Sequence, residues 1–353
     1  METMRLGKTN LTTSRVGIGG IPLTRPPAAE AARIVRYAID RGINFIDTAF
    51  GYSDSEERIG RGIAGVRDRV IIATKTPAND AITATEHLNT SLRRLGTNYI
   101  DLWQLHGISS ESGLKAVLAP GGAYEAAARA VQQGKVRHIG FSSHNVDVAG
   151  QCVATGLFAT AQIPFNFISD EAAHGLLDQC AAADVGFIGM KPFAGGAIRD
   201  AKLAFRWLLQ YPTVLPDPGI ERVEEIDQII AIVDSGQALT PADRAAIAAI
   251  RDQLGNRFCR QCEYCMPCPQ GVIIPGMMYL PLLYDLWPPE RFFSWRLVTA
   301  SVEGAARCSS CGICETKCPY QLPIRDMMRQ HLAFYDSVKE AWDQAQAGTG
   351  GSM

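Results

Sequence analysis

Short apolar runs alternate with amphipathic stretches over the first two thirds of the chain. Runs such as VIIATK (70–75) and YIDLWQLH (99–106) have the length and composition of strands, and stretches such as 28–41 and 81–95 have the period of helices. Eight such strand–helix repeats over about 220 residues predict an α/β fold, a parallel (β/α)8 TIM barrel. A doubly wound open sheet is the alternative. It would be expected to carry a Gly-rich phosphate loop, which VGIGGIPL (16–23) matches poorly.

The segments on either side of this repeat indicate the domain boundaries. Residues 1–16 predict a short hairpin with Asn10 near its turn. Residues 239–254 predict one more amphipathic helix, with Thr240 as its N-cap and Pro241 at its first position. The last residues are small and polar, which is typical of disorder. We therefore expect a barrel domain (1–254), a small α-rich domain (255–342) and a disordered tail (343–353).

The composition is that of an ordinary soluble protein, with one exception. Of the 353 residues 47% are apolar and 20% are charged, and the net charge of −2 gives no electrostatic reason to bind nucleic acid or an anionic membrane. No apolar run approaches the roughly 20 residues of a membrane span, and none resembles a signal peptide. The exception is cysteine. Eight of the ten cysteines lie between residues 259 and 318, which favours metal ligation over disulfides and a reducing, cytoplasmic location.

Four polar residues stand at or just after the ends of three successive strand-like runs. Asp47 and Tyr52 lie in GINFIDTAFGYSDSEERIG (42–60), Lys75 ends VIIATK and His106 ends YIDLWQLH. Reduction of a carbonyl requires a proton donor at the oxygen where negative charge develops. A phenol has a pKa of about 10, and we expect the Lys75 ammonium to lower it. Asp47 would then hold the lysine, and His106 would orient the substrate oxygen. The alternative is a salt bridge at the barrel rim beside a core histidine.

Seven segments carry a resemblance to a known family. They are RLGKTNLTTSRVGIGG, GINFIDTAFGYSDSEERIG, VIIATK, YIDLWQLHG, GKVRHIGFSS, AQIPFN and GMKPFAGG. In order and spacing, over about residues 4–235, they resemble the aldo-keto reductase superfamily. The resemblance implies a (β/α)8 barrel that binds a nicotinamide dinucleotide, NAD(H) or NADP(H), at its C-terminal rim. It also implies that the family's catalytic tetrad corresponds to Asp47, Tyr52, Lys75 and His106.

The same resemblance assigns residues to the nicotinamide, with departures. Family members hold the carboxamide with a Ser-Asn pair and a Gln, and this chain has Ser142, Ser143 and Gln162 at those positions. Ser143 therefore stands where Asn is usual. An aromatic residue normally stacks on the nicotinamide ring, whereas this chain has Met190 followed by Lys191.

The last strand–helix unit departs further from the family. In its sequence PDPGIERVEEIDQII (216–230), Gly219, Arg222 and Gln228 stand at positions that contact the nucleotide in members of the family. Glu225 stands where many NADP-specific members have Arg, and a carboxylate near a 2′-phosphate would repel it. Arg222 could compensate from one turn earlier. We therefore expect NADP(H) to bind poorly, with NAD(H) preferred or no dinucleotide used at all.

The clustered cysteines form two groups. Residues 308–319 have the spacing CxxCxxCxxxCP of bacterial ferredoxins, which ligate [4Fe–4S] clusters, and residues 259–269 have CxxCxxCxxCP, one residue short. Both groups resemble ferredoxin-like two-cluster domains. That resemblance implies one cluster on Cys259, Cys262, Cys265 and Cys318, and a second on Cys308, Cys311, Cys314 and Cys268. The short gap leaves the assignment of Cys268 open, and zinc is the alternative metal. We expect Cys152 and Cys180 in the core.

Three functional hypotheses follow from these features. In the one we favour, the protein is an oxidoreductase that acts on a small molecule, with Tyr52 as proton donor and electrons relayed by the clusters, a nicotinamide or both. A ferredoxin-like protein would then supply electrons as a partner. The second hypothesis is a nicotinamide-dependent carbonyl reductase whose clusters are structural. The third is a non-enzymatic, redox-sensing subunit, and the complete tetrad argues against it.

Overall fold

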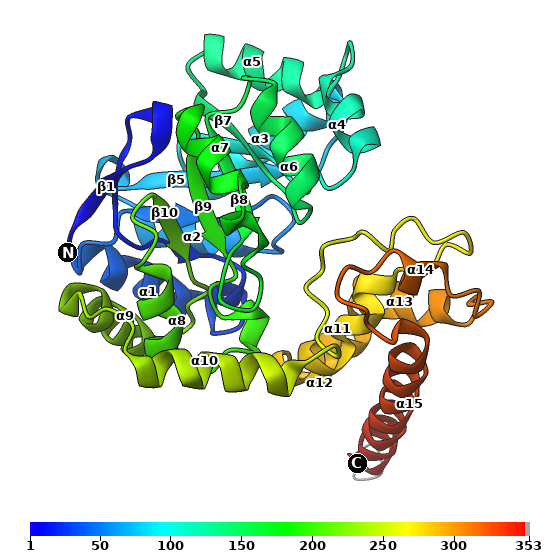
Figure 1. Cartoon of the computed structure of the whole chain (residues 1–353). Helices are drawn as coiled ribbons and strands as arrows, with labels where there is room; N and C mark the ends of the chain where they lie inside the picture. Colours follow the sequence, from blue (N-terminus) through cyan, green and yellow to red (C-terminus); the bar gives the residue numbers. More distant parts are fainter. Residues whose placement is uncertain (350–353) are drawn as a thin grey trace. The chain divides into compact units, whose positions relative to one another are not determined.

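The computed structural model describes residues 1–349 (Figure 1). The chain divides into two compact units, Met1–Ile247 and Ala248–Met353. The division falls within one helix, whereas composition placed the boundary at Gly255. No helix of the described residues is both long enough and apolar enough to cross a membrane.

The first unit is built on a parallel sheet of eight strands. In sheet order they are β3 (Ile18–Gly19), β4 (Phe45–Asp47), β5 (Ile71–Thr76), β6 (Ile100–Leu105), β7 (Val136–Ser142), β8 (Thr160–Pro164), β9 (Gly186–Met190) and β10 (Val214–Asp217). The last strand returns to the first, because Gly17 N–H donates to Pro216 O and Gly19 N–H donates to Pro218 O. The sheet is thereby nearly closed, so the predicted (β/α)8 barrel is confirmed and the open-sheet alternative is wrong.

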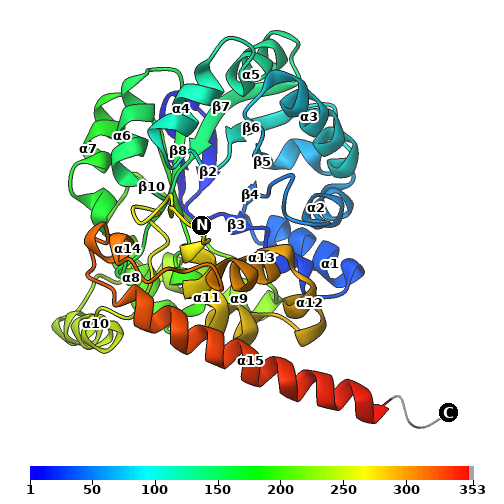
Figure 2. The same ribbon diagram turned by 90° about the vertical axis from the view of Figure 1, so that its right-hand side faces the viewer.

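Helices surround these strands (Figure 2). They are α1 (Ala28–Asp40), α2 (Ser55–Ile63), α3 (Ala81–Leu95), α4 (Glu111–Leu118), α5 (Ala123–Gln132), α6 (Val146–Ala154), α7 (Leu176–Ala182), α8 (Ala201–Leu208), α9 (Val223–Ser235) and α10 (Pro241–Leu254). Short 3-10 turns are η1 (Gly7–Thr9), η2 (Pro22–Thr24), η3 (Arg67–Arg69), η4 (Glu171–Ala173) and η5 (Ala194–Gly196). Several helices begin at a polar cap: Asp80 accepts from Thr83 N–H at 2.9 Å, and Thr240 Oγ1 accepts from Asp243 N–H at 3.1 Å, as predicted.

Two helical segments differ from the expectation. Helix α4 was not expected, yet Ser110 caps it and Leu114 and Val117 are buried on its inner face. The stretch 171–182 forms two short helices, η4 and α7, instead of one continuous helix, because Gly175 between them has φ of 115°. The N-terminal hairpin is present as β1 (Thr3–Arg5) and β2 (Thr12–Ser14), which pair antiparallel.

The second unit is helical in its described residues. It contains α11 (Ile274–Leu286), α12 (Pro289–Ser294), α13 (Arg296–Ala305), α14 (Ile313–Thr316) and α15 (Ile324–Thr349). Its core includes Met277, Phe292 and Met327, and several of the cysteines pack against that core. Burial of this apolar surface stabilises the unit, in which the described residues form no sheet.

Helix α15 corrects the expectation of disorder from residue 343, because it continues to Thr349. Two contacts stabilise its end, each between residues one helical turn apart. Lys339 Nζ lies 2.5 Å from Asp343 Oδ1, and Gln344 Nε2 donates to Glu340 Oε1 at 3.2 Å. Residues 350–353, which were also expected to be disordered, lie outside the described residues.

Candidate functional site

The four residues from the strand ends come together in the barrel. Lys75 on β5 donates from Nζ to Asp47 Oδ2 on β4 at 2.5 Å and to Thr48 O at 2.8 Å. Both members of this ion pair are buried. Lys75 Nζ lies 5.0 Å from the centre of the Tyr52 ring, and the His106 ring meets the Tyr52 ring edge-on at 5.7 Å. One phenol, one imidazole and one buried ion pair thus occupy one site.

Burial sets the protonation states of this site. It raises the pKa of the Tyr52 phenol, and the opposing effect of Lys75 is smaller. Lys75 acts in the expected direction and lowers this pKa, but burial outweighs it, so the net pKa is raised and the phenol stays protonated at neutral pH. Burial disfavours the Lys75 ammonium, but Asp47 beside it raises the Lys75 pKa overall. Burial, with Lys75 and Lys191, lowers the pKa of His106 to about 3, so its imidazole is neutral.

Sequence reasoning missed Gln104 and Asp217, which join Gln162, a residue assigned above to the nicotinamide, in a chain of buried amides that leads to a second carboxyl group. Gln104 Nε2 donates to Asp47 Oδ1 at 3.3 Å and to Gln162 Oε1 at 2.8 Å. Gln162 Nε2 donates to Asp217 Oδ2 at 3.0 Å. Asp217 ends β10 as Asp47 ends β4, and this parallel was the available signal. Burial, followed by the charge of Asp47, raises the Asp217 pKa well above its ordinary value.

The residues assigned to the nicotinamide carboxamide already make contacts within the protein. Ser142 Oγ accepts from Gly107 N–H at 2.9 Å, and Ser143 Oγ donates to Asn145 O at 3.0 Å. Both ends of the Gln162 amide bind inside the barrel, as described above. Ser143 and Gln162 are therefore engaged within the protein, whereas Ser142 uses only an acceptor site and its hydroxyl can still donate to a carboxamide oxygen.

The remaining nucleotide candidates are distributed along two strand ends and one helix. Met190 ends β9 half-buried, and Lys191 follows it in the left-handed region with φ of 57°. A Cβ on Gly219 would lie 2.6 Å from Pro22, so this glycine permits close packing of the chain on itself. Arg222 and Gln228 are exposed at the first turns of α9.

The N-terminus of α9 carries its own anion. Glu225 Oε2 accepts from the backbone N–H of Glu221 at 2.9 Å and of Arg222 at 3.3 Å. Glu225 Oε1 also accepts from the Arg222 guanidinium at 3.0 and 3.1 Å. A helix N-terminus is where a phosphate would bind. A 2′-phosphate would therefore have to displace the Glu225 carboxylate and its partner Arg222.

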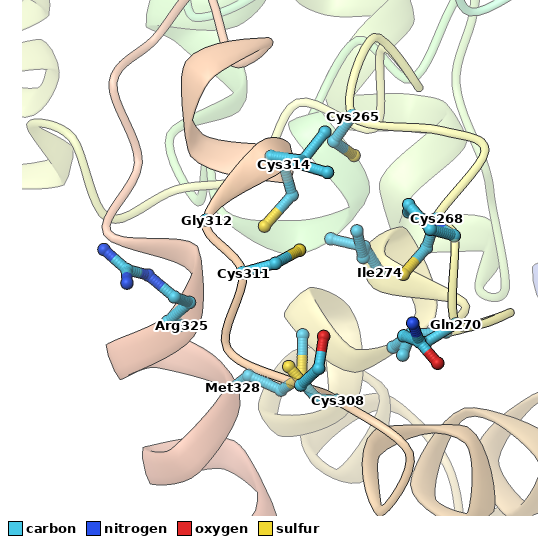
Figure 3. Close-up of a pocket in the computed structure, with 14 residues that line it drawn as sticks. Cys265, Cys268, Gln270, Ile274, Cys308, Cys311, Gly312, Cys314, Arg325 and Met328 are labelled. Carbon is cyan, nitrogen blue, oxygen red and sulfur yellow. The ribbon is translucent and has the colours of Figure 1, made fainter.

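The clustered cysteines line two hollows in the second unit. One, of about 340 Å³ including space open to solvent, is lined by Cys259, Cys262, Cys265 and Cys318. The other, of about 390 Å³, is lined by Cys268, Cys308, Cys311 and Cys314, and Cys265 also reaches it (Figure 3). Among the residues that the structure describes, no three His, Cys, Asp or Glu side chains lie close enough together to hold a single metal ion.

The backbone around the two hollows repeats. In each group of four cysteines, three residues at matching positions have positive φ. They lie two residues after the first cysteine, one residue after the second cysteine and three residues after the fourth cysteine. These residues are Gln261, Glu263 and Gly271 in one group, and Ser310, Gly312 and Gln321 in the other. Left-handed residues turn N–H groups toward a shared concavity that binds anionic sulfur or oxygen, and Gln261 N–H donates to Cys259 Sγ at 3.4 Å.

The donor set fits iron–sulfur clusters. Thiolates are the ligands of such clusters. Burial raises the pKa of the Cys265 thiol to about 12, so its thiolate requires a cation beside it. The two remaining cysteines differ: Cys152 and Cys180 are buried in the barrel helices, and burial raises each of their pKa values to about 12. They are core residues, as expected.

Two family models match this chain. The model described as the aldo/keto reductase family matches residues 13–204, and the model described as a 4Fe-4S dicluster domain matches residues 258–323. The first match covers the barrel strands up to β9 and the second contains all eight clustered cysteines.

Individual proteins resemble the barrel. Aldo-keto reductase YhdN from Bacillus subtilis is 32% identical over 197 residues, which are 50% of this chain and 57% of that protein. The crystal structure of an aldo/keto reductase from Klebsiella pneumoniae in complex with NADP and acetate is 25% identical, with a TM-score of 0.60 over 70% of this chain and 95% of that one. Aldo-keto reductase AKR11C1 from Bacillus halodurans, at 22% identity, shares the fold with a TM-score of 0.61 over 71% and 96%.

Proposed function

The chain belongs to the aldo/keto reductase family of oxidoreductases and carries a 4Fe-4S dicluster domain, and we propose that it reduces or oxidises a small carbonyl or alcohol at the C-terminal end of its barrel. In this proposal Tyr52 donates the proton that the substrate oxygen takes up and water supplies the proton that bonds to carbon, while two iron–sulfur clusters would supply the two electrons, one at a time, from a ferredoxin-like partner. The observation that carries the proposal is the buried Lys75–Asp47 pair beside Tyr52 and His106.

The acid chemistry follows from the protonation states. Because its pKa is raised, Tyr52 holds its proton until negative charge develops on a substrate oxygen. The neutral His106 imidazole donates a hydrogen bond to the same oxygen and orients it. After proton transfer, the Lys75 ammonium stabilises the Tyr52 phenolate, because the two groups are adjacent in a buried site.

The cysteine hollows support a role for clusters. Cys259, Cys262, Cys265 and Cys318 would hold one cluster, and Cys268, Cys308, Cys311 and Cys314 the other. When bound, such clusters transfer single electrons. The thiolates and the inward-facing N–H groups of the two loops would stabilise the clusters in this buried, apolar unit.

The contacts of Ser143 and Gln162 within the protein support clusters rather than a dinucleotide as the electron source. The second candidate function is an NADP-dependent carbonyl reductase with structural clusters, and the observation in its favour is the similar Klebsiella pneumoniae structure that contains NADP. Titration of the pure protein with NADPH and NADH, followed by nucleotide fluorescence, separates the two. We expect weak binding of NADPH, and micromolar affinity would favour the second candidate.

Anaerobic reconstitution with iron and sulfide, followed by EPR of the reduced protein, tests the cluster proposal. We expect two [4Fe–4S] signals, of which Cys318→Ser removes one. Cys152→Ser is the matched control, because this cysteine lies in the barrel core, and it should keep both signals. Zinc without iron in the purified and reconstituted protein would refute the proposal.

A further inference from the structure

A second buried carboxyl group lies beside the ion pair of the site. Asp217 is 5% exposed at the end of β10, and its carboxyl lies within hydrogen-bonding reach of Asp47 on β4. Its Oδ2 accepts from Gln162. Its Oδ1 has no hydrogen-bond partner among the described residues. A buried oxygen without a donor is costly unless it carries or shares a proton.

The positive charge near Asp217 is too small to balance two carboxylates, one on Asp217 and one on Asp47. Lys75 on β5 is the buried cation, and Tyr52 and His106 are uncharged at neutral pH. Lys191, after β9, is only half-buried, and the facing groups on β6 and β8 are the neutral amides of Gln104 and Gln162. Two adjacent carboxyl groups that share one buried cation cannot both ionise readily, so one keeps a proton.

That proton belongs mainly to Asp217. The Asp47 carboxylate accepts from Lys75 at 2.5 Å and from Gln104 at 3.3 Å, and both donors stabilise its charge. Among the described residues, Asp217 accepts a hydrogen bond only from the Gln162 amide, and it lies next to the charge of Asp47. Burial raises the pKa of both groups, and that of Asp217 lies well above its ordinary value.

We propose that Asp217 is a positioning residue that holds one proton in the resting enzyme and returns it, through Asp47 and Lys75, to the Tyr52 phenolate left after each turnover. The inference rests on the proposed role of Tyr52 as proton donor. In the transfer, the O–H bond of Asp217 breaks and one forms on Asp47. Asp47 then passes a proton to Lys75 as Lys75 gives one to Tyr52.

The transfer conserves charge and runs downhill. It begins with a phenolate and a neutral Asp217, and it ends with a neutral phenol and an Asp217 carboxylate, while Asp47 and Lys75 return to their initial states. A phenolate is a much stronger base than a carboxylate, so the proton moves toward Tyr52. A proton from water then restores Asp217 before the next turnover.

Infrared spectroscopy of the resting, full-length protein tests the inference without a substrate. Ordinary carboxyl groups are ionised at pH 7, so a protonated one gives a distinct C=O stretching band. We expect this band in the wild type at pH 7, its loss as the pH is raised, and its absence in Asp217→Asn. Asp217→Glu, which restores an acid, should restore the band.

Each outcome decides the matter. A wild type without the band at pH 7, or a band that persists in Asp217→Asn, overturns the inference. If Asp217→Asn fails to fold, Asp217→Glu decides: a band that shifts in frequency from that of an Asp to that of a Glu carboxyl group belongs to residue 217, and an unchanged band belongs to another group and overturns the inference. The band does not depend on turnover, so a failure of the proposed function would leave this result unchanged.

Discussion

Replacement of Lys75 by Met removes the buried cation that pairs with Asp47 while it keeps about the length of the side chain. Lys75 and Asp47 are 1% and 3% exposed, and they form an ion pair at 2.5 Å. Removal of one partner from a buried pair leaves the other charge uncompensated, which costs about 3–5 kcal/mol. We therefore expect Lys75→Met to lower the free energy of barrel unfolding by about 3–5 kcal/mol at pH 8.

The loss should shrink as the pH falls. Burial raises the pKa of Asp47, and Lys75 opposes that rise. Without Lys75 the pKa of Asp47 rises further above its unfolded value of about 4. At pH values between the Asp47 pKa of the wild type and that of the variant, Asp47 is protonated in the folded variant and ionised in the folded wild type. The deficit should therefore decrease by up to about 1.4 kcal/mol per pH unit toward low pH.

Urea unfolding at pH 5, 6, 7 and 8 provides the assay, read by hydrogen exchange in peptides from the barrel strands. Peptide resolution is needed because the chain has two compact units, and a chain of two units need not unfold in a single transition. Lys115→Met, at an exposed position on α4, is the control and should change stability by less than about 0.5 kcal/mol. A deficit that is equal at pH 5 and pH 8, or larger at pH 5, would refute the reasoning.

Two further predictions concern single side chains. The pKa of His106 is about 3, so His106 should not titrate near pH 6.5 in the pH–rate profile of the wild type. An inflection near pH 6.5 that is present in the wild type and absent in His106→Gln would contradict a neutral imidazole. Glu225→Gln should strengthen NADPH binding, since loss of about 1 kcal/mol of repulsion corresponds to roughly fivefold in affinity. Glu224→Gln, exposed on the same helix, is the control in the same fluorescence titration and should change little. Equal effects of the two substitutions would exclude a special role for Glu225.

The barrel and the first four site residues could be predicted because each rests on local pattern. The alternation of apolar runs and amphipathic stretches marks the strands, and Asp47, Lys75 and His106 are each found where a run ends. In a parallel barrel those ends meet at one face, so spacing along the chain suffices to bring the side chains together.

The remainder of the site depends on contacts that no local pattern encodes. The approach of Asp217 to Asp47 requires closure of the barrel, which brings β10 next to β3, the neighbour of β4. The raised pKa of Tyr52 depends on how deeply the ring is buried, and a sequence motif does not report depth. Glu225 was expected to repel a phosphate, but its contacts with Arg222 and the backbone appear only when α9 is folded.

The most direct test of cluster-driven chemistry at Tyr52 uses reduced clusters without nucleotide. The reconstituted protein is reduced anaerobically, freed of excess reductant and mixed with a panel of small aldehydes, while EPR follows the reduced clusters. We predict that an aldehyde of the panel reoxidises the clusters in the wild type, and that Tyr52→Phe slows this reaction by about 10²–10⁴-fold. Tyr124→Phe, at a partly exposed position on α5, is the control and should react like the wild type. Clusters that stay reduced with every aldehyde, in a protein that turns over the same panel with NADPH, would contradict the proposal.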